Sequence, residues 1–249
     1  MKNTQRLDKI LAHMGYGSRS EIRNYARKGV IKVNGQISKD SGIQVDPERD
    51  EIIIHDQLLM YRAHIYLMMN KPPGVISATE DRIERTVIDV LHEAYTAYSL
   101  FPVGRLDKDT EGLLLLTNDG KLAHQLLSPR KHVPKTYLVH VQWEIDEASQ
   151  KALETGIQLD DGYVSLPAQL RMLVQGNHKS QEVSVVELTI FEGKYHQVKR
   201  MFEALGQQVV YLRRISMGPL ILDPNLPLGK FRELTELELD ALNHYITAY

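Results

Sequence analysis

The sequence has 249 residues, of which 43% are hydrophobic and 25% are charged, and these proportions are typical of a globular protein. It contains no cysteine, which excludes disulfides, thiolate metal sites and cysteine nucleophiles. No apolar run approaches the roughly 18 residues of a membrane span, and the N-terminus lacks the apolar stretch of a secretory signal. We therefore expect a cytoplasmic protein without a membrane-spanning segment.

The formal net charge of −2 hides an asymmetry along the chain. Residues 1–39 carry nine Lys and Arg against two acidic residues, a charge of +7, and the remainder carries 21 against 30, a charge of −9. A basic segment of this kind favours contact with a polyanion such as a nucleic acid. An ordinary solvated helix face has the same composition, so charge alone leaves both interpretations open.

The N-terminal part carries the signals of two helices. Apolar residues at i, i+3, i+4 and i+7 predict an amphipathic helix over residues 7–14, which Gly15 can end. Ser18 and Glu21 form a capping-box pattern that begins a second helix, and Lys28 lies at its end.

The second predicted helix carries three arginines at every fourth position, so they share one face. They are Arg19, Arg23 and Arg27. Guanidinium groups bind phosphate oxygens in pairs, and an aligned row of them can follow a nucleic acid backbone. Beyond this helix we expect a strand over 30–33, a hairpin turn at Asn34-Gly35 and a last strand over 51–54.

The remaining sequence alternates short strands with a few helices, which predicts an α+β fold with a largely antiparallel sheet. A turn with two prolines and a glycine, Asn70-Lys71-Pro72-Pro73-Gly74, separates the first strand from an extended segment. The expected strands are 65–69, 113–116, 137–142 and 183–190, and the expected helices are 86–92 and 195–205.

A polar loop with three acidic residues precedes a buried strand and an Asp-Gly turn. Asp107, Asp109 and Glu111 follow Gly104, which lets the loop bend, and they lie beside Arg105 and other basic residues. Taken alone, such a loop is consistent with a metal site, with a nucleophile and its charge partners, or with a solvated turn. The solvated turn is the commonest of the three.

Residues 6–54 resemble the S4 RNA-binding domain, from Arg6-Leu7-Asp8-Lys9 through Ser18-Arg19 to Val33-Asn34-Gly35. The resemblance implies binding to structured RNA, largely by shape and by phosphate contacts. The basic residues expected to contact RNA in this domain are Arg6, Lys9, Arg19, Arg23, Arg27 and Lys28.

The rest of the chain resembles the pseudouridine synthases of the RsuA type, which act on ribosomal RNA of the small subunit. The motifs that carry the resemblance stand in the family's order: Asn70 to Gly74, Gly104 to Gly120, Lys135-Thr136-Tyr137, Glu192 to Phe202, Leu212 to Leu220 and Gly229 to Leu234. Together with the S4-like part, the resemblance covers the chain from Arg6 to about Leu239.

The resemblance implies a small helix-helix-hairpin S4 domain over residues 1–57, a linker over 58–64 and a catalytic domain over 65–249. The catalytic domain would be built on a mostly antiparallel mixed sheet with flanking helices. Its reaction would isomerise one uridine of 16S ribosomal RNA, of the uridine-516 type, within an assembling small subunit. The reaction gains and loses no atoms, so the resemblance implies no cofactor and no metal, and it favours a monomer.

Three residues carry the chemistry that the resemblance implies. Asp107 is the catalytic carboxylate, which acts as nucleophile or stabilises cationic character on the sugar. Lys199 is the basic residue placed against it, and an opposite charge favours the ionised form of an acid. The Tyr137 ring can stack on the uracil while its hydroxyl assists loss of the C5 proton. Without the resemblance, Lys199 would be interpreted as an exposed helix lysine and Tyr137 as a core residue.

Further residues are expected to support the site or contact RNA near it. They are Arg105, Lys71, His196, Gln197, Arg200 and Leu220. Arg105 can bind a phosphate or brace its loop, Lys71 lies in a turn that can approach a phosphate, and Leu220 can pack against the target base. The basic segment before Tyr137, residues 130–135, is a further candidate RNA contact.

Three alternatives remain at this point. The same chemistry can act on 23S ribosomal RNA, since relatives with that substrate share these motifs. The protein can be an RNA-binding assembly factor whose catalysis is dispensable, although the set of Asp107, Tyr137 and Lys199 argues against this. A metal-dependent nuclease using Asp107, Asp109 and Glu111 is the least favoured.

Overall fold

The computed structural model describes residues 4–176 and 183–247 and divides the chain into two compact units. Unit 1 comprises residues 1–65 and 91–100, and unit 2 comprises 66–90 and 101–249. The expected domain ends at residues 1 and 249 lie outside the described residues.

Unit 1 begins with the two helices that the sequence predicts, α1 (Leu7–His13) and α2 (Arg19–Arg27). The capping box at the start of α2 is confirmed, because the Ser18 hydroxyl accepts the Glu21 amide and the Glu21 carboxylate accepts the Ser18 amide at 2.8 Å. Two strand groups complete the unit. They are a sheet in the order β3 (Gln36–Ile37), β2 (Ile31–Val33), β5 (Ile52–Ile54), β6 (Gln57–Leu58), and a pair of β1 (Gln5–Arg6) with β4 (Gln44–Val45).

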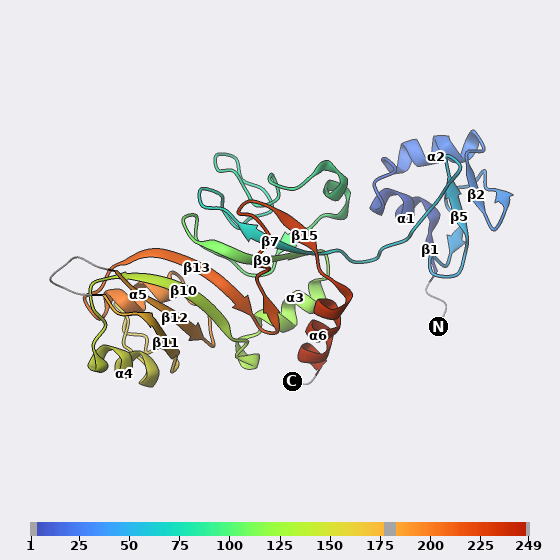
Figure 1. Ribbon diagram of the computed structural model, residues 1–249. Helices are drawn as coiled ribbons and strands as arrows, with labels where there is room; N and C mark the ends of the chain where they lie inside the picture. Colours follow the sequence, from blue (N-terminus) through green and yellow to red (C-terminus); the bar gives the residue numbers. More distant parts are fainter. Residues whose placement is uncertain (1–3, 177–182, 248–249) are drawn as a thin grey trace. The chain divides into compact units, whose positions relative to one another are not determined.

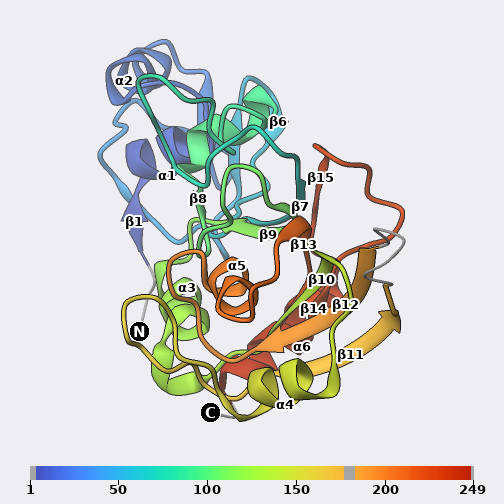
Figure 2. The same cartoon turned by 90° about the vertical axis from the view of Figure 1, so that its left-hand side faces the viewer.

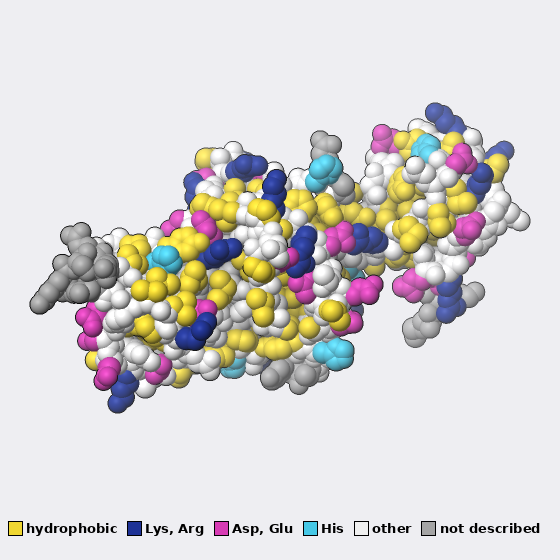
Figure 3. Space-filling view, viewed as in Figure 1, with side chains coloured by type: hydrophobic (Ala, Val, Ile, Leu, Met, Phe, Trp, Pro, Cys, Tyr) yellow, Lys and Arg dark blue, Asp and Glu magenta, His cyan; other side chains and the backbone are white. Residues whose placement is uncertain are grey.

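The apolar stripe of the predicted amphipathic helix α1 packs against the apolar face of α2 and the sheet. Leu7, Ile10 and Leu11 of α1 are fully buried with Ile22 of α2 and Ile54 of β5. The arginine face of α2 points outward, and Figure 3 shows Lys and Arg side chains over α2 on the surface of unit 1.

A segment from the later part of the chain belongs to unit 1. Residues 93–98 form the 3-10 helix η1 (Glu93–Tyr98), and the Tyr98 ring lies edge-on to the His13 ring at 5.3 Å. The predicted helix over 86–92 is wrong. Thr86 pairs with Ile76 in a β-bridge, and the Asp89 carboxylate accepts the Thr86 amide at 2.8 Å, which closes a turn instead of a helix.

Unit 2 is built on one nine-stranded sheet, which confirms the mostly antiparallel mixed sheet (Figures 1 and 2). Its order is β11 (Gln169–Val174), β12 (Val183–Ile190), β10 (Lys135–Gln142), β13 (Val209–Met217), β9 (Glu111–Thr117), β7 (Tyr66–Lys71) and β15 (Phe231–Glu233). The two-residue strand β14 (Leu220–Ile221) pairs with β13, and β8 (Phe101–Pro102) pairs with β9.

The pair of β9 with β13 is parallel, and a glycine allows its close approach. Gly112 lies opposite Arg214 with φ +102°, and a Cβ added at Gly112 would lie 2.2 Å from the Arg214 carbonyl oxygen. Only glycine fits this position, because any side chain would collide with the backbone of β13. The acidic loop before β9 is thereby fixed beside the middle of the sheet.

The helices α3 (Gly120–Leu127), α4 (Glu147–Thr155), α5 (Gln197–Glu203) and α6 (Glu236–Thr247) complete unit 2, with α4 against β11 and α5 against β13. The expected Asp-Gly turn is the start of α3, where the Asp119 carboxylate accepts the amides of Lys121 and Leu122. The predicted helix over 195–205 begins two residues late, because His196 has left-handed dihedrals. Within the described residues, no helix has the length and apolar content to cross a membrane.

Candidate active site

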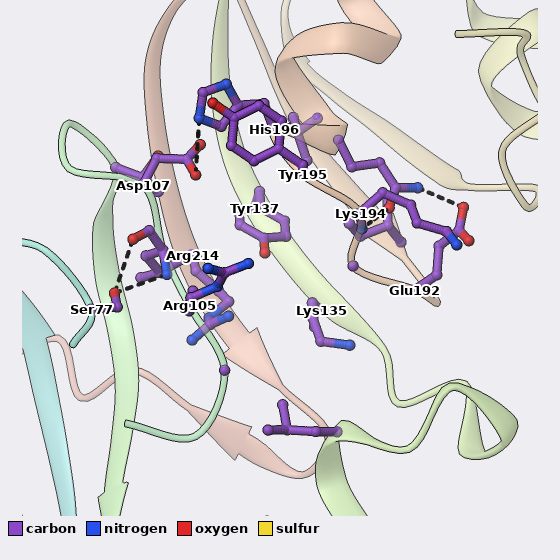
Figure 4. Close-up of a pocket in the computed structure, with 18 of the residues that line it drawn as sticks. Ser77, Arg105, Asp107, Lys135, Tyr137, Glu192, Lys194, Tyr195, His196 and Arg214 are labelled. Atoms are coloured by element: carbon purple, nitrogen blue, oxygen red, sulfur yellow. Dashed lines mark hydrogen bonds and ion pairs between the residues drawn. The ribbon is translucent and has the colours of Figure 1, made fainter. Parts of the chain in front are cut away.

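A cleft of about 1120 Å³ opens in unit 2 where the acidic loop faces β10 and the start of α5 (Figure 4). The loop supplies Asp107, β10 supplies Tyr137, and the turn before α5 supplies His196. Sequence segments nearly 90 residues apart therefore meet in one place, as the resemblance predicted.

The loop that carries Asp107 is held from beneath by hydrogen bonds to its backbone. The Ser77 hydroxyl accepts the Leu106 amide at 3.0 Å and donates to the Leu106 carbonyl at 2.9 Å. Gly104, with φ +82°, provides the bend before the loop, and a Cβ there would lie 3.0 Å from the Leu127 side chain. The Asp107 side chain is left 27% exposed at the cleft.

Lys71 also anchors this loop, and its expected contact with a phosphate is wrong. The residue is fully buried at the end of β7, and its Nζ donates to the carbonyl oxygens of Pro72, Asp107, Lys108 and Thr110 at 2.9–3.3 Å. Burial lowers the pKa of Lys71 to about 8, against the opposing effect of nearby carboxylates. Its hydrogen bonds cross-link the turn at Pro72 to the loop that carries Asp107.

Two basic side chains from the α5 region flank the Asp107 carboxylate. His196 Nε2 lies 3.5 Å from Asp107 Oδ1, and Lys199 Nζ lies 3.8 Å from Asp107 Oδ2. Lys199 makes its shorter contacts to Asp109, at 2.7 Å to both carboxylate oxygens. Burial alone would raise the pKa of Asp109, but the hydrogen bond and charge of Lys199 outweigh it and hold this pKa below its usual value. Lys199 therefore joins both acids of the loop.

Tyr137 lies in the middle of the sheet and lines the cleft. Its Cα pairs with Leu188 of β12 on one side and Arg214 of β13 on the other, and the residue is 8% exposed. Figure 4 shows its ring in the cleft between Asp107 and Lys135. A buried ring beside a carboxylate gives the cleft a flat apolar surface next to its charged group.

The turn before α5 is strained, and hydrogen bonds of the buried Gln197 side chain to Glu192 and Lys194 hold it. His196 has φ +49°, an uncommon value for a residue with a side chain, and its ring stacks on Tyr195 at 3.8 Å. Gln197 is 3% exposed, donates to Glu192 at 2.7 Å and accepts the Lys194 amide at 2.8 Å. Gln197 lines the cleft, and its side-chain amide is engaged in hydrogen bonds within the protein.

Four expected site residues are not among those that line the cleft: Lys71 and Lys199, described above, and Arg200 and Leu220. Arg200 is bonded to Asp160 and Asp161, so it fixes a neighbouring loop. Leu220 is 1% exposed within the apolar core of unit 2, and its expected contact with the target base is wrong. Leu212, from the same motif, lines the cleft instead. The alternation of β13 could have identified it, because Leu212 and Arg214 lie two residues apart.

Two further cations lie at the cleft. Arg214 was not assigned as a site residue from the sequence, and Lys135 was expected only as an RNA contact within the segment 130–135. Arg214 is 1% exposed and donates through Nε to the Leu113 carbonyl at 2.8 Å. Lys135 lines the cleft beside it, and burial, with the nearby Arg214 charge, lowers the pKa of Lys135 to about 8. Arg105 is exposed at the cleft without a hydrogen bond or ion pair to the described residues, so its side chain does not brace the loop there.

The three acids of the loop do not form a ligand set for a metal. Asp109 is paired with Lys199, and Glu111 accepts the Tyr211 hydroxyl at 2.7 Å. Over residues 4–176 and 183–247, no group of three potential ligand side chains is placed to hold a metal ion. The geometry thus does not support the interpretation as a metal-dependent nuclease.

In unit 1, the expected RNA-contacting residues lie on the surface. Arg6, Lys9, Arg19, Arg23, Arg27 and Lys28 are all exposed. Arg6 is partly engaged, because it forms an ion pair with the buried Asp8 at 2.7 Å.

The fold and the cleft define an enzyme that isomerises uridine in RNA. Residues 65–204 match the family described as RNA pseudouridylate synthase and residues 5–52 match the S4 domain, and the chain belongs to this family of pseudouridine synthases. It is similar to an uncharacterized RNA pseudouridine synthase, YtzG, of Bacillus subtilis, with 51% identity over 96% of this chain and 98% of the relative.

Among the relatives whose names state a ribosomal subunit, some are small-subunit and others large-subunit pseudouridine synthases. The ribosomal small subunit pseudouridine synthase A of Haemophilus influenzae is 39% identical, over 95% of this chain and 99% of that one. The ribosomal large subunit pseudouridine synthase B of Bacillus subtilis is 37% identical, over 96% and 95%. A crystal structure of a pseudouridylate synthase matches with a TM-score of 0.66 and 39% identity, over 95% of this chain and 99% of that chain.

Proposed function

We propose that the protein converts one uridine of 16S ribosomal RNA, of the uridine-516 type, to pseudouridine in an assembling small subunit. The motif from Gly104 to Gly112 and the segment from Ile215 to Pro219 favour the small-subunit branch. Identity to the small-subunit enzyme of Haemophilus influenzae, 39%, supports this target over the large-subunit one at 37% only by a narrow margin. The observation that carries the activity itself is the cleft in which Asp107 faces a buried tyrosine.

The proposed reaction rearranges bonds within one nucleotide. The bond from sugar C1′ to uracil N1 breaks, the uracil turns in the cleft, and a bond from C1′ to C5 forms. C5 loses a proton and N1 gains one, so no co-reactant is consumed. The protein must therefore hold the free uracil and keep water from the cationic sugar.

Asp107 is the proposed group that attacks the substrate or stabilises its cationic sugar. Lys199 Nζ and His196 Nε2 lie 3.8 Å and 3.5 Å from its two oxygens, so an ammonium and an imidazole flank the carboxylate. Lys71 and Ser77 fix the loop backbone, so the carboxylate is held in position before substrate arrives. The role proposed for Lys199 is the one that the resemblance implies, with the lysine shared between Asp107 and Asp109.

Tyr137 is the proposed surface on which the uracil turns. Its ring can stack on the base, and the apolar Leu212 lines the same cleft. A base must leave its stack to enter, at a cost of about a few kcal/mol, which this stacking would offset. Its hydroxyl is the candidate group to take the C5 proton.

The proposal also includes recognition of folded RNA by the exposed basic residues of unit 1, action as a monomer, and a cytoplasmic location, where ribosomes assemble. Sedimentation of the purified protein would check the monomer.

Release of tritium from C5-labelled uridine tests the proposal. We would compare 16S transcript, partly assembled small subunits and 23S transcript, using wild type, Asp107→Asn and Asp109→Asn. We expect release from a small-subunit substrate, loss of release in Asp107→Asn with RNA binding retained, and reduced but measurable release in Asp109→Asn. The asparagine variants keep the size of each side chain and remove only its charge.

Each other outcome identifies the part that is wrong. Release from 23S transcript alone would contradict the subunit assignment and leave the chemistry standing. Loss of release in Asp109→Asn with activity kept in Asp107→Asn would contradict the choice of carboxylate. RNA binding without release from any substrate would favour the assembly factor.

A further inference from the structure

Two cations on neighbouring strands, Lys135 of β10 and Arg214 of β13, lie at the cleft without a carboxylate partner. Arg214 is paired with Tyr137 in the sheet, and Tyr137 follows Lys135 by two residues. Figure 4 shows Arg214 and Lys135 below the Tyr137 ring, with Asp107 above it and Arg105 near Arg214. The three residues Lys135, Tyr137 and Arg214 all line the cleft.

Several other cations in and near the cleft are paired, although the exposed Arg105 and Lys194 also line it without an ion pair to a described residue. Lys108, Lys199 and Arg200 each form an ion pair with an acidic side chain at 2.8 Å or less. Among the described residues, neither Lys135 nor Arg214 has such a pair. Lys135 donates to the Val133 carbonyl at 2.9 Å, and Arg214 to the Leu113 carbonyl. Carbonyl oxygens satisfy hydrogen-bonding groups but do not neutralise a charge.

Glu192, the one acidic residue that influences the pKa of Lys135, is already hydrogen-bonded to other groups. Glu192 raises the pKa of Lys135 only as the weakest of three influences, after burial and Arg214, which both lower it. Its two oxygens accept hydrogen bonds from Tyr163 at 2.6 Å, from Gln197 at 2.7 Å and from the Leu166 amide at 3.0 Å. Glu192 therefore takes part in the hydrogen bonds that hold the turn before α5, and it does not form an ion pair with Lys135.

Arg214 also has a buried donor without a partner. Its Nη2 is enclosed and makes no hydrogen bond in the structure. Two neighbouring cations repel each other, and a buried donor without a partner costs free energy, so a bound ligand of opposite charge would offset both costs. The ligand that repays both costs is an anion.

We propose that Lys135 and Arg214 form a phosphate-binding site for the nucleotide whose base enters the cleft. Lys135, which is partly exposed, makes the direct contact with a phosphate oxygen, and Arg214 supplies charge from beneath. The inference rests on the proposed position of the target uracil between Asp107 and Tyr137. It adds that the enzyme recognises the phosphate next to the extruded base as well as the base itself.

Binding of mononucleotides to the full chain tests this site without any RNA sequence. Uridine, 5′-UMP and 3′-UMP would be titrated by calorimetry at about pH 7, where Lys135 is charged. We expect one of the two monophosphates to bind about ten- to a hundredfold more tightly than uridine. Which isomer gains tells which of the two backbone phosphates occupies the site.

Variants of Lys135 and Arg214 then test whether these two residues cause the tighter binding of the monophosphate. Lys135→Met keeps an apolar stem and should lower the affinity for the monophosphate to near the affinity for uridine. Lys135→Arg should retain most of the difference between the two affinities. Arg214→Lys should weaken it while keeping a cation at the position. The control is Lys194→Met, because Lys194 lines the same cleft but lies over the Tyr163 ring at 4.5 Å, and this variant should retain the gain.

Equal affinity for uridine and both monophosphates would overturn the proposal, and so would monophosphates that do not bind. A phosphate gain that survives Lys135→Met and Arg214→Lys, in proteins that melt like wild type, would also overturn it. Mononucleotides carry no target sequence. A wrong subunit assignment would therefore change the tritium assay and leave these affinities as they are.

Discussion

The basic side chains of the S4 unit and those around the catalytic cleft differ in exposure and in bonding. On α2, Arg19, Arg23 and Arg27 stand in a row on the solvent face of a helix. In unit 2, Arg214 at the cleft and Lys71 behind its acidic loop are buried and bonded to backbone carbonyl oxygens. The surface row can act on a long polyanion through its summed charge, whereas the buried cations act on particular atoms of the site.

The comparison explains why the two kinds of cation need different support. A surface arginine requires only a helix, since water solvates its charge and the protein loses little if it is removed. A buried lysine must be given hydrogen bonds for every N–H, because its desolvation is costly. Lys71 donates to four carbonyl oxygens, and these contacts also tie the turn at Pro72 to the loop that carries Asp107.

The largest expected effect is that of Lys71→Met. The substitution leaves the carbonyl oxygens of the loop without their donor, so it should lower the free energy of unfolding by about 3 kcal/mol. Displacement of Asp107 by about 1 Å should slow isomerisation about a hundredfold. Thermal melting and tritium release measure the two effects.

The matched control is Lys108→Met in the same loop. Lys108 is half exposed and pairs with Glu84 on the surface, so its loss should cost about 0.5 kcal/mol or less. A Lys71→Met protein that melts and reacts like Lys108→Met would show that the buried contacts do not hold the loop.

A smaller effect is expected from the surface row. Replacing Arg19, Arg23 and Arg27 by glutamine should weaken RNA binding and reduce the slope of log affinity against log salt by about two to three, because each phosphate contact releases a counterion. The melting temperature should hardly change. Filter binding at several salt concentrations measures the slope.

Arg171→Gln serves as the control for the surface row. Arg171 is exposed in unit 2 and paired with Glu187, so its loss removes one positive charge without touching α2. If the triple variant keeps the wild-type salt slope, RNA does not follow this face of the helix.

The smallest expected effect concerns pH. The pKa of Lys135 is lowered to about 8, so its ammonium is charged below that pH and loses its proton as pH rises through it. The KM for RNA should therefore rise a few-fold between about pH 7 and 9, while Lys135→Arg, which stays charged, should move this rise to higher pH.

Lys151→Arg on the exposed face of α4 controls for the substitution itself and should follow wild type. A KM rise that is identical in Lys135→Arg and wild type would assign it to another group.

Much of unit 1 could be predicted from the sequence because its signals are local. The stripe of Leu7, Ile10 and Leu11 and the capping box at Ser18 act within a few residues, and α1 and α2 follow them. The same local reasoning placed a helix over 86–92, where the Asp89 carboxylate closes a turn around Thr86 instead. Side-chain capping can stabilise either structure, and the β-bridge to Ile76 decides between them.

The sequence by itself determined the family, the sheet class, the meeting of Asp107 and Tyr137 in one cleft and the approach of Lys199 to Asp107, because motif order reflects the fold that all members share. Only the tertiary structure decided which side chains face the cleft. It turned Lys71 inward, placed Leu220 in the core and brought Leu212 and Arg214 to the cleft. The reason is physical: strand register and the parallel contact at Gly112 set the direction of each side chain, and these depend on residues a hundred positions apart.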